Sequence, residues 1–198
     1  MPIISCAWEQ RKLEDITKYH NAGIYVEKSK YGKGKNIIGV SNIYDNDVVD
    51  GTVYSVAPVA DEKYILHNGD LLYGESSLVL KGIAKTMCVN SAGDGTAFAW
   101  HTRRFTIDQQ ICSPYFLMLE LNYDFKLRKY FMSVATQTAL TGITTSDYFR
   151  AEITFPSVVE QRAIGKLIKI VFKLIAANQC QQKRRNLLKF TRLFKNAI

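Results

Sequence analysis

Hydrophobic and polar residues alternate over short distances in the first three-quarters of the chain. Four stretches, residues 36–44, 48–57, 71–89 and 97–107, are rich in valine, isoleucine, tyrosine, phenylalanine and threonine, and glycines punctuate them. β-Branched and aromatic residues favour extended backbone, and glycines mark turns. This pattern predicts a set of short strands.

A helix is predicted after the last of these stretches. Ser113 suits the N-cap position and Pro114 the first helical position, and apolar residues follow at helical spacing through Phe131. Another strand-like run, residues 152–155, closes this part of the chain. Strands combined with this helix predict an α+β domain over residues 1–156.

The chain after Pro156 has a different period. Ser157 and Glu160 match a capping box, in which the serine hydroxyl accepts the backbone N–H of the glutamate and the carboxylate accepts the backbone N–H of the serine. Neither glycine nor proline occurs after Gly165, so one helix of about 57 Å is predicted. Residues 157–198 therefore form a separate long helix that ends near Asn196.

The apolar residues of this helix change face along its length. Projected at about 100° per residue, those of the first half cover a broad arc opposite a lysine stripe, and those of the second half are turned by about a third of the circumference. The helix is therefore expected to contact more than one neighbour. The residues expected to face a partner helix are Ile164, Ile168, Val171, Ile175, Leu187, Phe190 and Phe194.

The long helix has three possible arrangements. It packs flat on its own domain with a solvated basic face, or it is a spacer that pairs with a second long helix through a heptad-like seam. The length favours the spacer, because a helix of about 57 Å exceeds the width of such a domain. A basic amphipathic helix on anionic lipid is disfavoured, because the basic face switches sides.

The chain carries a formal net charge of +8, but the excess is confined to its end. Residues 157–198 hold 10 of the 26 lysines and arginines and one of the 18 acidic residues, Glu160. The preceding residues are therefore close to neutral. A concentrated positive charge favours an anionic partner, such as DNA phosphates or an acidic protein surface.

The sequence lacks the patterns of common catalytic and metal sites. The four cysteines and three histidines are scattered, so we expect no disulfide framework, no structural metal and no cofactor. Adjacent prolines, a phosphate-binding loop and a nucleophile elbow are all missing, so a non-catalytic protein is expected. No membrane span or secretory signal is evident, so we expect a cytoplasmic protein with no membrane partner.

Five short segments, in order along the chain, carry a family resemblance. They are residues 8–16 (WEQRKLEDI), 68–73 (NGDLLY), 113–117 (SPYFL), 155–157 (FPS) and 160–165 (EQRAIG). The chain resembles one of the two repeats of the specificity subunit of a type I restriction-modification system. The resemblance implies a target-recognition domain over residues 1–156 and a spacer and dimerisation helix over residues 157–198, which pairs antiparallel, as in a coiled coil, with a second such helix.

The resemblance also implies sequence-specific recognition of double-stranded DNA without catalysis. In this family each recognition domain reads one half of a bipartite target, and the subunit directs methyltransferase and restriction subunits to it. A half-length chain restores two recognition domains if it forms a homodimer through its long helix, and such a dimer implies a palindromic split target. Alternatively, the chain is a truncated, inactive fragment of a two-repeat subunit, or a non-catalytic scaffold that uses its basic helix.

Candidate DNA contacts lie in five polar parts of the expected recognition domain. A basic loop suits phosphates, while polar or aromatic residues after two predicted strands, an arginine pair and a threonine-rich segment suit base edges. A solvated loop and a paired surface charge are the alternatives for the basic loop and the arginines. The segment of residues 137–150 is too polar and too broken by glycine for a core element, so a loop is expected there. The candidates are Lys30, Lys33, Lys35, Ser41, Asn42, Tyr44, Tyr73, Ser76, Ser77, Arg103, Arg104, Thr141, Thr144, Thr145 and Arg150, with Glu75 between two of them.

Overall fold

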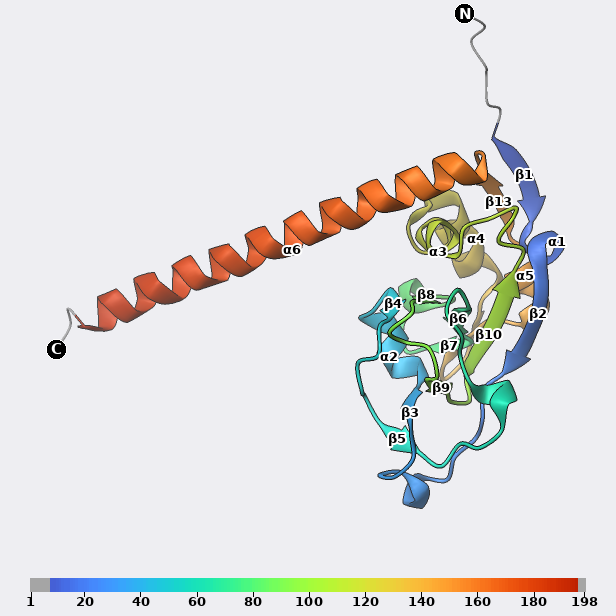
Figure 1. Ribbon diagram of the computed structural model, residues 1–198, viewed down its shortest axis with the longest axis horizontal. Coiled ribbons are helices and arrows are strands. Elements are labelled where there is room, and N and C mark those ends of the chain that lie inside the picture. The colour runs from blue at the N-terminus through green and yellow to red at the C-terminus, as the bar shows by residue number, and fades with distance from the viewer. Residues whose placement is uncertain (1–7, 196–198) are drawn as a thin grey trace, which may run out of the picture. The chain divides into compact units, whose positions relative to one another are not determined.

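The protein divides into two compact units. The computed structural model describes residues 8–195, with side chains described for residues 8–183 (Figure 1). The first unit ends at Gln161 and the second begins at Arg162, within one long helix. Among the described residues, no helix is long and apolar enough to cross a membrane.

A five-stranded sheet forms the centre of the first unit. Its strand order is β2-β10-β6-β8-β4, and neighbours are antiparallel except β8 and β4, which are parallel. Every residue of β6 and β8 is buried, as expected for inner strands of a sheet covered on both faces. The strands are β2 (Thr17–Ala22), β10 (Thr102–Ile107), β6 (Leu71–Gly74), β8 (Thr86–Val89) and β4 (Val48–Val49).

Three smaller sheets join segments that are distant in the sequence. β1 pairs antiparallel with β13, the strand that precedes the long helix. The other two have the orders β11-β12-β7 and β5-β3-β9. Their strands are β1 (Glu9–Lys12), β13 (Glu152–Phe155), β11 (Thr136–Gln137), β12 (Thr141–Gly142), β7 (Ser76–Ser77), β5 (Val56–Ala57), β3 (Lys35–Ile38) and β9 (Ala97–Phe98).

Short helices connect the strands, and one long helix follows them. This β-rich unit with short helices and a long C-terminal helix confirms the predicted α+β class. The helices are α1 (Leu13–Ile16), α2 (Val40–Tyr44), α3 (Pro114–Tyr123), α4 (Phe125–Val134), α5 (Thr145–Phe149) and α6 (Val158–Lys195), with the 3-10 turns η1 (Lys28–Lys30), η2 (Glu62–Tyr64) and η3 (Leu80–Gly82).

The strands are shorter than the sequence pattern predicts. Residues 40–44, predicted to be extended, form helix α2, because Asn42 Oδ1 accepts the Gly39 N–H (2.9 Å) and caps its first turn. The stretches 48–57 and 71–89 each hold two or more short strands separated by irregular backbone. Local polar contacts and turns therefore interrupt strands that the apolar pattern predicts to be continuous.

The single helix predicted after Ser113 is two helices. α3 begins at Pro114, as predicted, and ends at Tyr123. Asp124 has an extended backbone, and its carboxylate accepts the Leu127 N–H (2.8 Å), which caps the start of α4. The chain therefore turns at Asp124, where the apolar spacing alone predicts continuity.

A stack of aromatic rings packs beside the central sheet. The Tyr73 and Tyr148 rings are nearly parallel, with centroids 3.6 Å apart, and Phe131 stacks on Tyr148 at 5.3 Å. Phe105 and Phe149 meet both tyrosine rings edge-on. Both tyrosines are fully buried. Large aromatic rings of this kind dominate core energetics, so the stack fixes β6, β10, α4 and α5 to one another.

The segment of residues 137–150 contributes to this core, so the predicted polar loop is wrong there. Strand β12 pairs with β7, and the short helix α5 places Tyr148 and Phe149 among the buried rings. The Tyr148 hydroxyl shares a hydrogen bond of 2.8 Å with Thr86 Oγ1 in β8. Two consecutive aromatic residues therefore anchor a segment that is otherwise polar.

The start of α6 lies at the end of the first unit and is capped by its own side chains. The Ser157 hydroxyl accepts the Glu160 N–H (3.4 Å), and Glu160 Oε2 accepts the Ser157 N–H (3.1 Å). These reciprocal bonds form the capping box expected at this sequence. They satisfy two of the backbone N–H groups that a helix start leaves free.

The next residue, Gln161, fixes this first turn to the first unit. Its fully buried carboxamide accepts the Ser113 N–H (2.8 Å) and donates to the carbonyls of Ile111 (3.1 Å) and Pro156 (2.9 Å). These bonds offset the cost of burying an amide, which is large when the group is unpaired. The side chain thereby joins the start of α3 to the start of α6.

Replacing Gln161 by alanine is expected to lower the free energy of unfolding by about 2–4 kcal/mol. The change leaves one N–H and two carbonyls of the main chain without their partner in a buried place. Chemical denaturation followed by circular dichroism measures the loss. Gln182, which is exposed on α6, is the matched control, and its replacement by alanine is expected to change stability by less than about 0.5 kcal/mol. Equal stabilities of the two variants would contradict this role of Gln161.

Candidate functional site

Polar side chains from separate segments meet where β6 ends and β10 begins. The Tyr44 hydroxyl of α2 donates to the Ser76 carbonyl (2.6 Å), and β7 pairs with β12. The Glu75 carboxylate accepts the Arg103 Nε–H (2.8 Å). Residues from α2, β7, β10 and the segment around β12 therefore lie together, although the sequence separates them widely.

Arg103 lies at the centre of this meeting point. Besides its bond to Glu75, its Nη1 is 3.4 Å from His20 Nδ1, and it lies opposite Tyr73 in the β10–β6 pairing. The Arg103 and Glu75 side chains are 18% and 22% exposed. Thr145, at the start of α5, lines one groove together with His20. We call His20, Tyr73, Glu75, Arg103 and Thr145 the Arg103 cluster.

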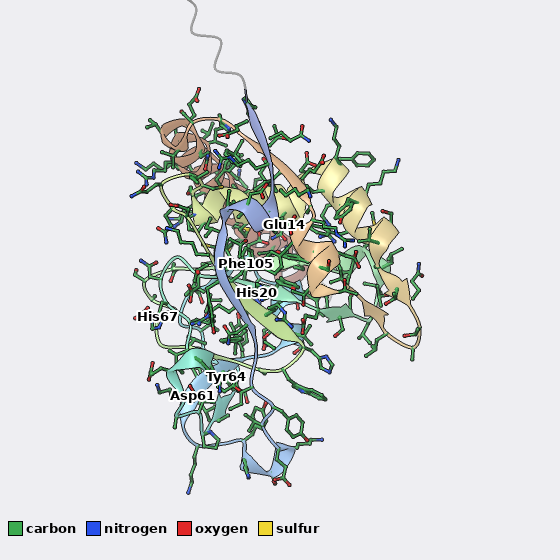
Figure 2. All side chains as sticks on the ribbon, turned by 90° about the vertical axis from the view of Figure 1, so that its right-hand side faces the viewer. Glu14, His20, Asp61, Tyr64, His67 and Phe105 are labelled. Carbon is green, nitrogen blue, oxygen red and sulfur yellow. The ribbon has the colours of Figure 1, made fainter. Side chains whose placement is uncertain are left out.

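His20 is placed by its ring and by its strand. On β2 it lies opposite Phe105 of β10 (Figure 2), and its ring stacks on that of Phe149 with centroids 4.8 Å apart. Burial lowers the pKa of His20, and the positive charge of Arg103 lowers it further. The imidazole is therefore mainly uncharged at neutral pH, and its Nδ1 is able to accept a hydrogen bond from the guanidinium.

A shallow groove opens beside the Arg103 cluster. Its volume is about 520 Å³, and two members of the cluster, His20 and Thr145, form part of its wall. The cluster therefore reaches the surface of the first unit. The residues lining the groove are Glu14, Thr17, Lys18, Tyr19, His20, Thr145, Ser146 and Phe149.

Tyr73 does not lie where the sequence-based hypothesis requires. Its side chain is fully buried in the aromatic stack, so it has no surface with which to contact DNA, and the prediction of a DNA contact is corrected. Its hydroxyl has no hydrogen-bond partner of good geometry among the described residues, although the nearby Thr145 and Arg103 side chains both act to lower its pKa. Burial raises the pKa of Tyr73 well above its usual value.

Arg104 is also turned into the protein, because neighbouring residues of a strand face opposite sides of the sheet. Its guanidinium donates to the Ile65 carbonyl (2.6 Å) and to Asn21 Oδ1 (3.1 Å), and it lies 3.7 Å from the Asp70 carboxylate. Only 7% of the residue is exposed. The prediction that Arg104 contacts a base is therefore corrected.

Two further candidates are buried at the β7–β12 pairing. Ser77 lies opposite Thr141 in this sheet, and both are almost without exposed surface. The Ser77 hydroxyl donates to the Val79 carbonyl (2.6 Å) and accepts the Val79 N–H (3.1 Å), so it stabilises a turn. The predictions of DNA contacts for Ser77 and Thr141 are corrected in the same way.

Several remaining candidates cap helices or form ion pairs at the surface. The Thr144 hydroxyl accepts the Asp147 N–H (3.1 Å) and starts α5, while Arg150 lies 3.5 Å from Asp147. Arg150 lines a second groove of about 440 Å³, together with Lys12 and Lys126. Thr144 and Arg150 are exposed.

The basic loop lies in another part of the first unit. Lys30 and Lys35 are exposed and pair with Glu27 (3.8 Å) and Glu62 (3.4 Å), respectively. Lys33 is exposed in the turn between them. The loop leads into β3, which belongs to a different sheet from the Arg103 cluster (Figure 1). The structure therefore does not bring all the predicted contacts into one cluster.

His20 is the member of the cluster that the sequence does not indicate. Nothing near it in the sequence marks it, since its partners on β10 are more than 80 residues away. Only the pairing of β2 with β10 identifies it. Within the described part of the chain, no group of three or more histidine, cysteine or acidic side chains is arranged to hold a metal ion.

Comparison with known proteins gives one family. The model of the type I restriction modification DNA specificity domain matches residues 7–187. A search of curated protein sequences returned no match.

Three solved structures have a similar fold. They are a chain from work on complex assembly and conformational transition of the type I R-M system (TM-score 0.62, 16% identity), the HsdS subunit from Thermoanaerobacter tengcongensis (0.61, 17%) and the type I restriction-modification S subunit from M. genitalium (0.54, 15%). The matches cover 87–89% of this chain but only 40–41% of those chains. The chain therefore spans about two-fifths of their length, and at these identities the likeness concerns the fold.

Two tyrosine-to-phenylalanine changes are expected to differ in their effect on stability. Tyr148→Phe removes the hydroxyl that bonds Thr86 and should cost about 0.5–1.5 kcal/mol, whereas Tyr73→Phe removes a buried hydroxyl without a partner and should be neutral or stabilising. Both changes keep the ring stack, so thermal unfolding compares the hydroxyls alone. An equal loss in both variants would mean that the Tyr73 hydroxyl is bonded in solution.

Proposed function

Since the chain belongs to the family of type I restriction modification DNA specificity domains, we propose that it recognises a specific sequence in double-stranded DNA. The observation that carries this proposal is the extent of the family match, residues 7–187, which includes the β-rich unit and most of α6. In the proposed organisation, residues 1–156 are the recognition domain and residues 157–198 the spacer helix. The proposed role is recognition without catalysis, in the cytoplasm.

The proposed DNA contacts are the candidates whose side chains keep some exposed surface. Base reading needs directional donors and acceptors, whereas phosphate binding needs cations. Arg103 and the residues around it suit the first role, and the basic loop suits the second. The proposed contacts are Lys30, Lys33, Lys35, Ser41, Asn42, Tyr44, Ser76, Arg103, Thr144, Thr145 and Arg150.

We also propose that two copies pair through α6. The helix exposes large apolar side chains, among them Leu167 (60%), Ile170 (56%) and Leu174 (59%). An exposed apolar surface of this extent favours a protein partner, because a lone helix gains little stability in water. We propose a second copy as that partner, because a two-fold dimer places two recognition domains on one DNA target.

The proposed seam follows a heptad-like spacing. Ile164, Ile168, Val171 and Ile175 are spaced by four, three and four residues, as in a coiled coil. Val171 and Ile175 are 39% and 47% exposed, and Ile164 and Ile168 are half-buried. The predicted seam residues Leu187, Phe190 and Phe194 lie outside the described side chains, so they remain predictions.

The proposed partners of such a dimer are methyltransferase subunits and, through them, a restriction subunit. An acidic protein surface, or the DNA between two half-sites, is the proposed partner of the lysines and arginines of α6. Arg162, Lys166, Lys173 and Lys183 are exposed along the described part of the helix. A scaffold without DNA specificity is the alternative, and it predicts binding that does not depend on sequence.

Expression of the chain with methyltransferase subunits of this family is expected to methylate host DNA at a split, palindromic motif. The palindrome follows from the two-fold symmetry of the proposed homodimer. Methylation-sensitive sequencing of the host genome reads the motif, and cells with the methyltransferase subunits alone are the control. The absence of any motif that depends on the chain would contradict DNA recognition, and an asymmetric motif would contradict the homodimer.

A charged residue in the proposed seam is expected to weaken dimerisation at least about 10-fold. Val171→Asp or Ile175→Asp places a carboxylate in an apolar interface, where burial of an unpaired charge is costly. Sedimentation equilibrium measures the dissociation constant. Cys180→Asp is the matched control, because residue 180 is exposed and lies seven residues after Lys173, on the lysine face opposite the seam. A monomeric wild-type chain at high concentration, or equal effects of all three variants, would contradict the proposed seam.

A further inference from the structure

We infer that Glu75 is a positioning residue that holds the Arg103 guanidinium in the orientation that reads a guanine of the DNA target. This inference rests on the proposed function, because it assigns a role within the same recognition site. It concerns the pair Glu75–Arg103 and its neighbours His20 and Tyr73. The bonds of the guanidinium, its burial and its charge support it.

The bond to Glu75 determines which edge of the guanidinium is left for DNA. Arginine has five N–H donors in a planar fork. In the structure the Nε–H is bonded to Glu75 Oε1 (2.8 Å), so the two terminal nitrogens carry the remaining donors. Two parallel N–H groups match the O6 and N7 acceptors that guanine presents in the major groove. No other base presents two adjacent acceptors of this kind there.

The neighbours of the pair restrict the guanidinium further. His20 lies 3.4 Å from Nη1, and its own ring is held by stacking on Phe149. The fully buried Tyr73 lies opposite Arg103 on the adjacent strand, and its hydroxyl has no partner among the described residues. The strand pairing and the stacked His20 ring therefore limit how the guanidinium is oriented.

The charge of the Glu75–Arg103 pair favours a base, rather than a phosphate, as the group that Arg103 contacts. Contact with phosphate depends on net positive charge, and the Glu75–Arg103 pair has none. The carboxylate weakens the attraction of the pair for phosphate, yet it leaves the directional donors in place. A salt bridge that is only about a fifth exposed also loses less to solvent than a surface pair. The pair is thus better suited to specificity than to affinity.

The neighbouring arginine shows the contrasting arrangement. Arg104 uses its donors on Ile65 and Asn21 inside the protein, and little of its surface is exposed. Arg103 has side-chain partners only, Glu75 and His20, among its described hydrogen bonds. A structural role of the Arg104 kind therefore does not account for Arg103.

The test uses the methylation motif that the full chain directs in cells that also express methyltransferase subunits. Glu75→Ala and Arg103→Ala are expected to keep the motif but to lose preference for one guanine in each half-site. The loss expected for one bidentate contact is about 5- to 150-fold in the ratio of methylation at guanine sites to that at substituted sites. Glu75→Gln keeps an oxygen acceptor for the Nε–H and is expected to retain most of the preference.

The double variant Glu75→Ala with Arg103→Ala separates positioning from a merely structural role. If Glu75 acts through Arg103, the double variant relaxes the motif no further than Arg103→Ala alone. Glu9→Ala is the matched control, since it removes a carboxylate from a surface ion pair with Arg11, neither of which is a proposed DNA contact, and it should leave the motif unchanged. Thermal unfolding of each purified variant distinguishes loss of specificity from loss of fold.

The outcomes distinguish this inference from the proposed function. A wild-type chain that directs no motif overturns the proposed function. A wild-type motif that stays unchanged in folded Arg103→Ala and Glu75→Ala variants overturns the role of Glu75 and leaves the proposed function intact. A motif without guanine in either half, or a relaxation by Glu75→Ala at positions that Arg103→Ala does not affect, also overturns it.

Discussion

The rest of the first unit depends on the buried contact between Tyr73 and Tyr148. Their rings lie 3.6 Å apart, one on an inner strand of the central sheet and the other on the short helix α5. The segment that carries Tyr148 is mostly polar, and Ile143 and Phe149 are its other large apolar residues in the core. This contact, with the Tyr148 bond to Thr86, therefore helps to place β12 beside β7 and Thr145 within the Arg103 cluster. Burial of two aromatic rings stabilises the site, although neither ring reaches the surface.

Neighbouring residues of a strand face opposite sides of the sheet, so two adjacent arginines have different roles. Arg103 faces the side of β10 where Tyr73, Glu75 and His20 lie, and Arg104 faces the opposite side, where main-chain and side-chain oxygens bind its guanidinium. A shift of one residue in the β10–β6 pairing would exchange the two side chains. The register that the aromatic stack helps to set therefore decides which arginine pairs with Glu75.

Local signals in the sequence predict the ends of elements better than the contents of the site. The capping pair Ser157 and Glu160, Pro114 at the start of α3 and strand β13 all depend on residues within a few positions of one another. The partners of Arg103 do not, because His20 comes from a strand more than 80 residues away. Residue polarity wrongly predicts DNA contacts at four positions that are buried in the fold: Tyr73, Ser77, Arg104 and Thr141. A polar residue type indicates the capacity to bond to DNA, and only the sheet pairing shows whether the side chain reaches the surface.

On the proposed function, charge separates affinity from specificity in this chain. Positive charge that attracts phosphates is concentrated after residue 157, where lysines and arginines meet a single acidic residue, whereas the guanidinium of the Arg103 cluster is neutralised by Glu75. On the proposed function, a salt-sensitive attraction along α6 and the basic loop brings the protein to any duplex. A neutral pair then adds little to that attraction and contributes only where its donors meet matching acceptors. Such a division favours discrimination between sequences, because a cation at the reading position would also stabilise binding to the wrong base pair.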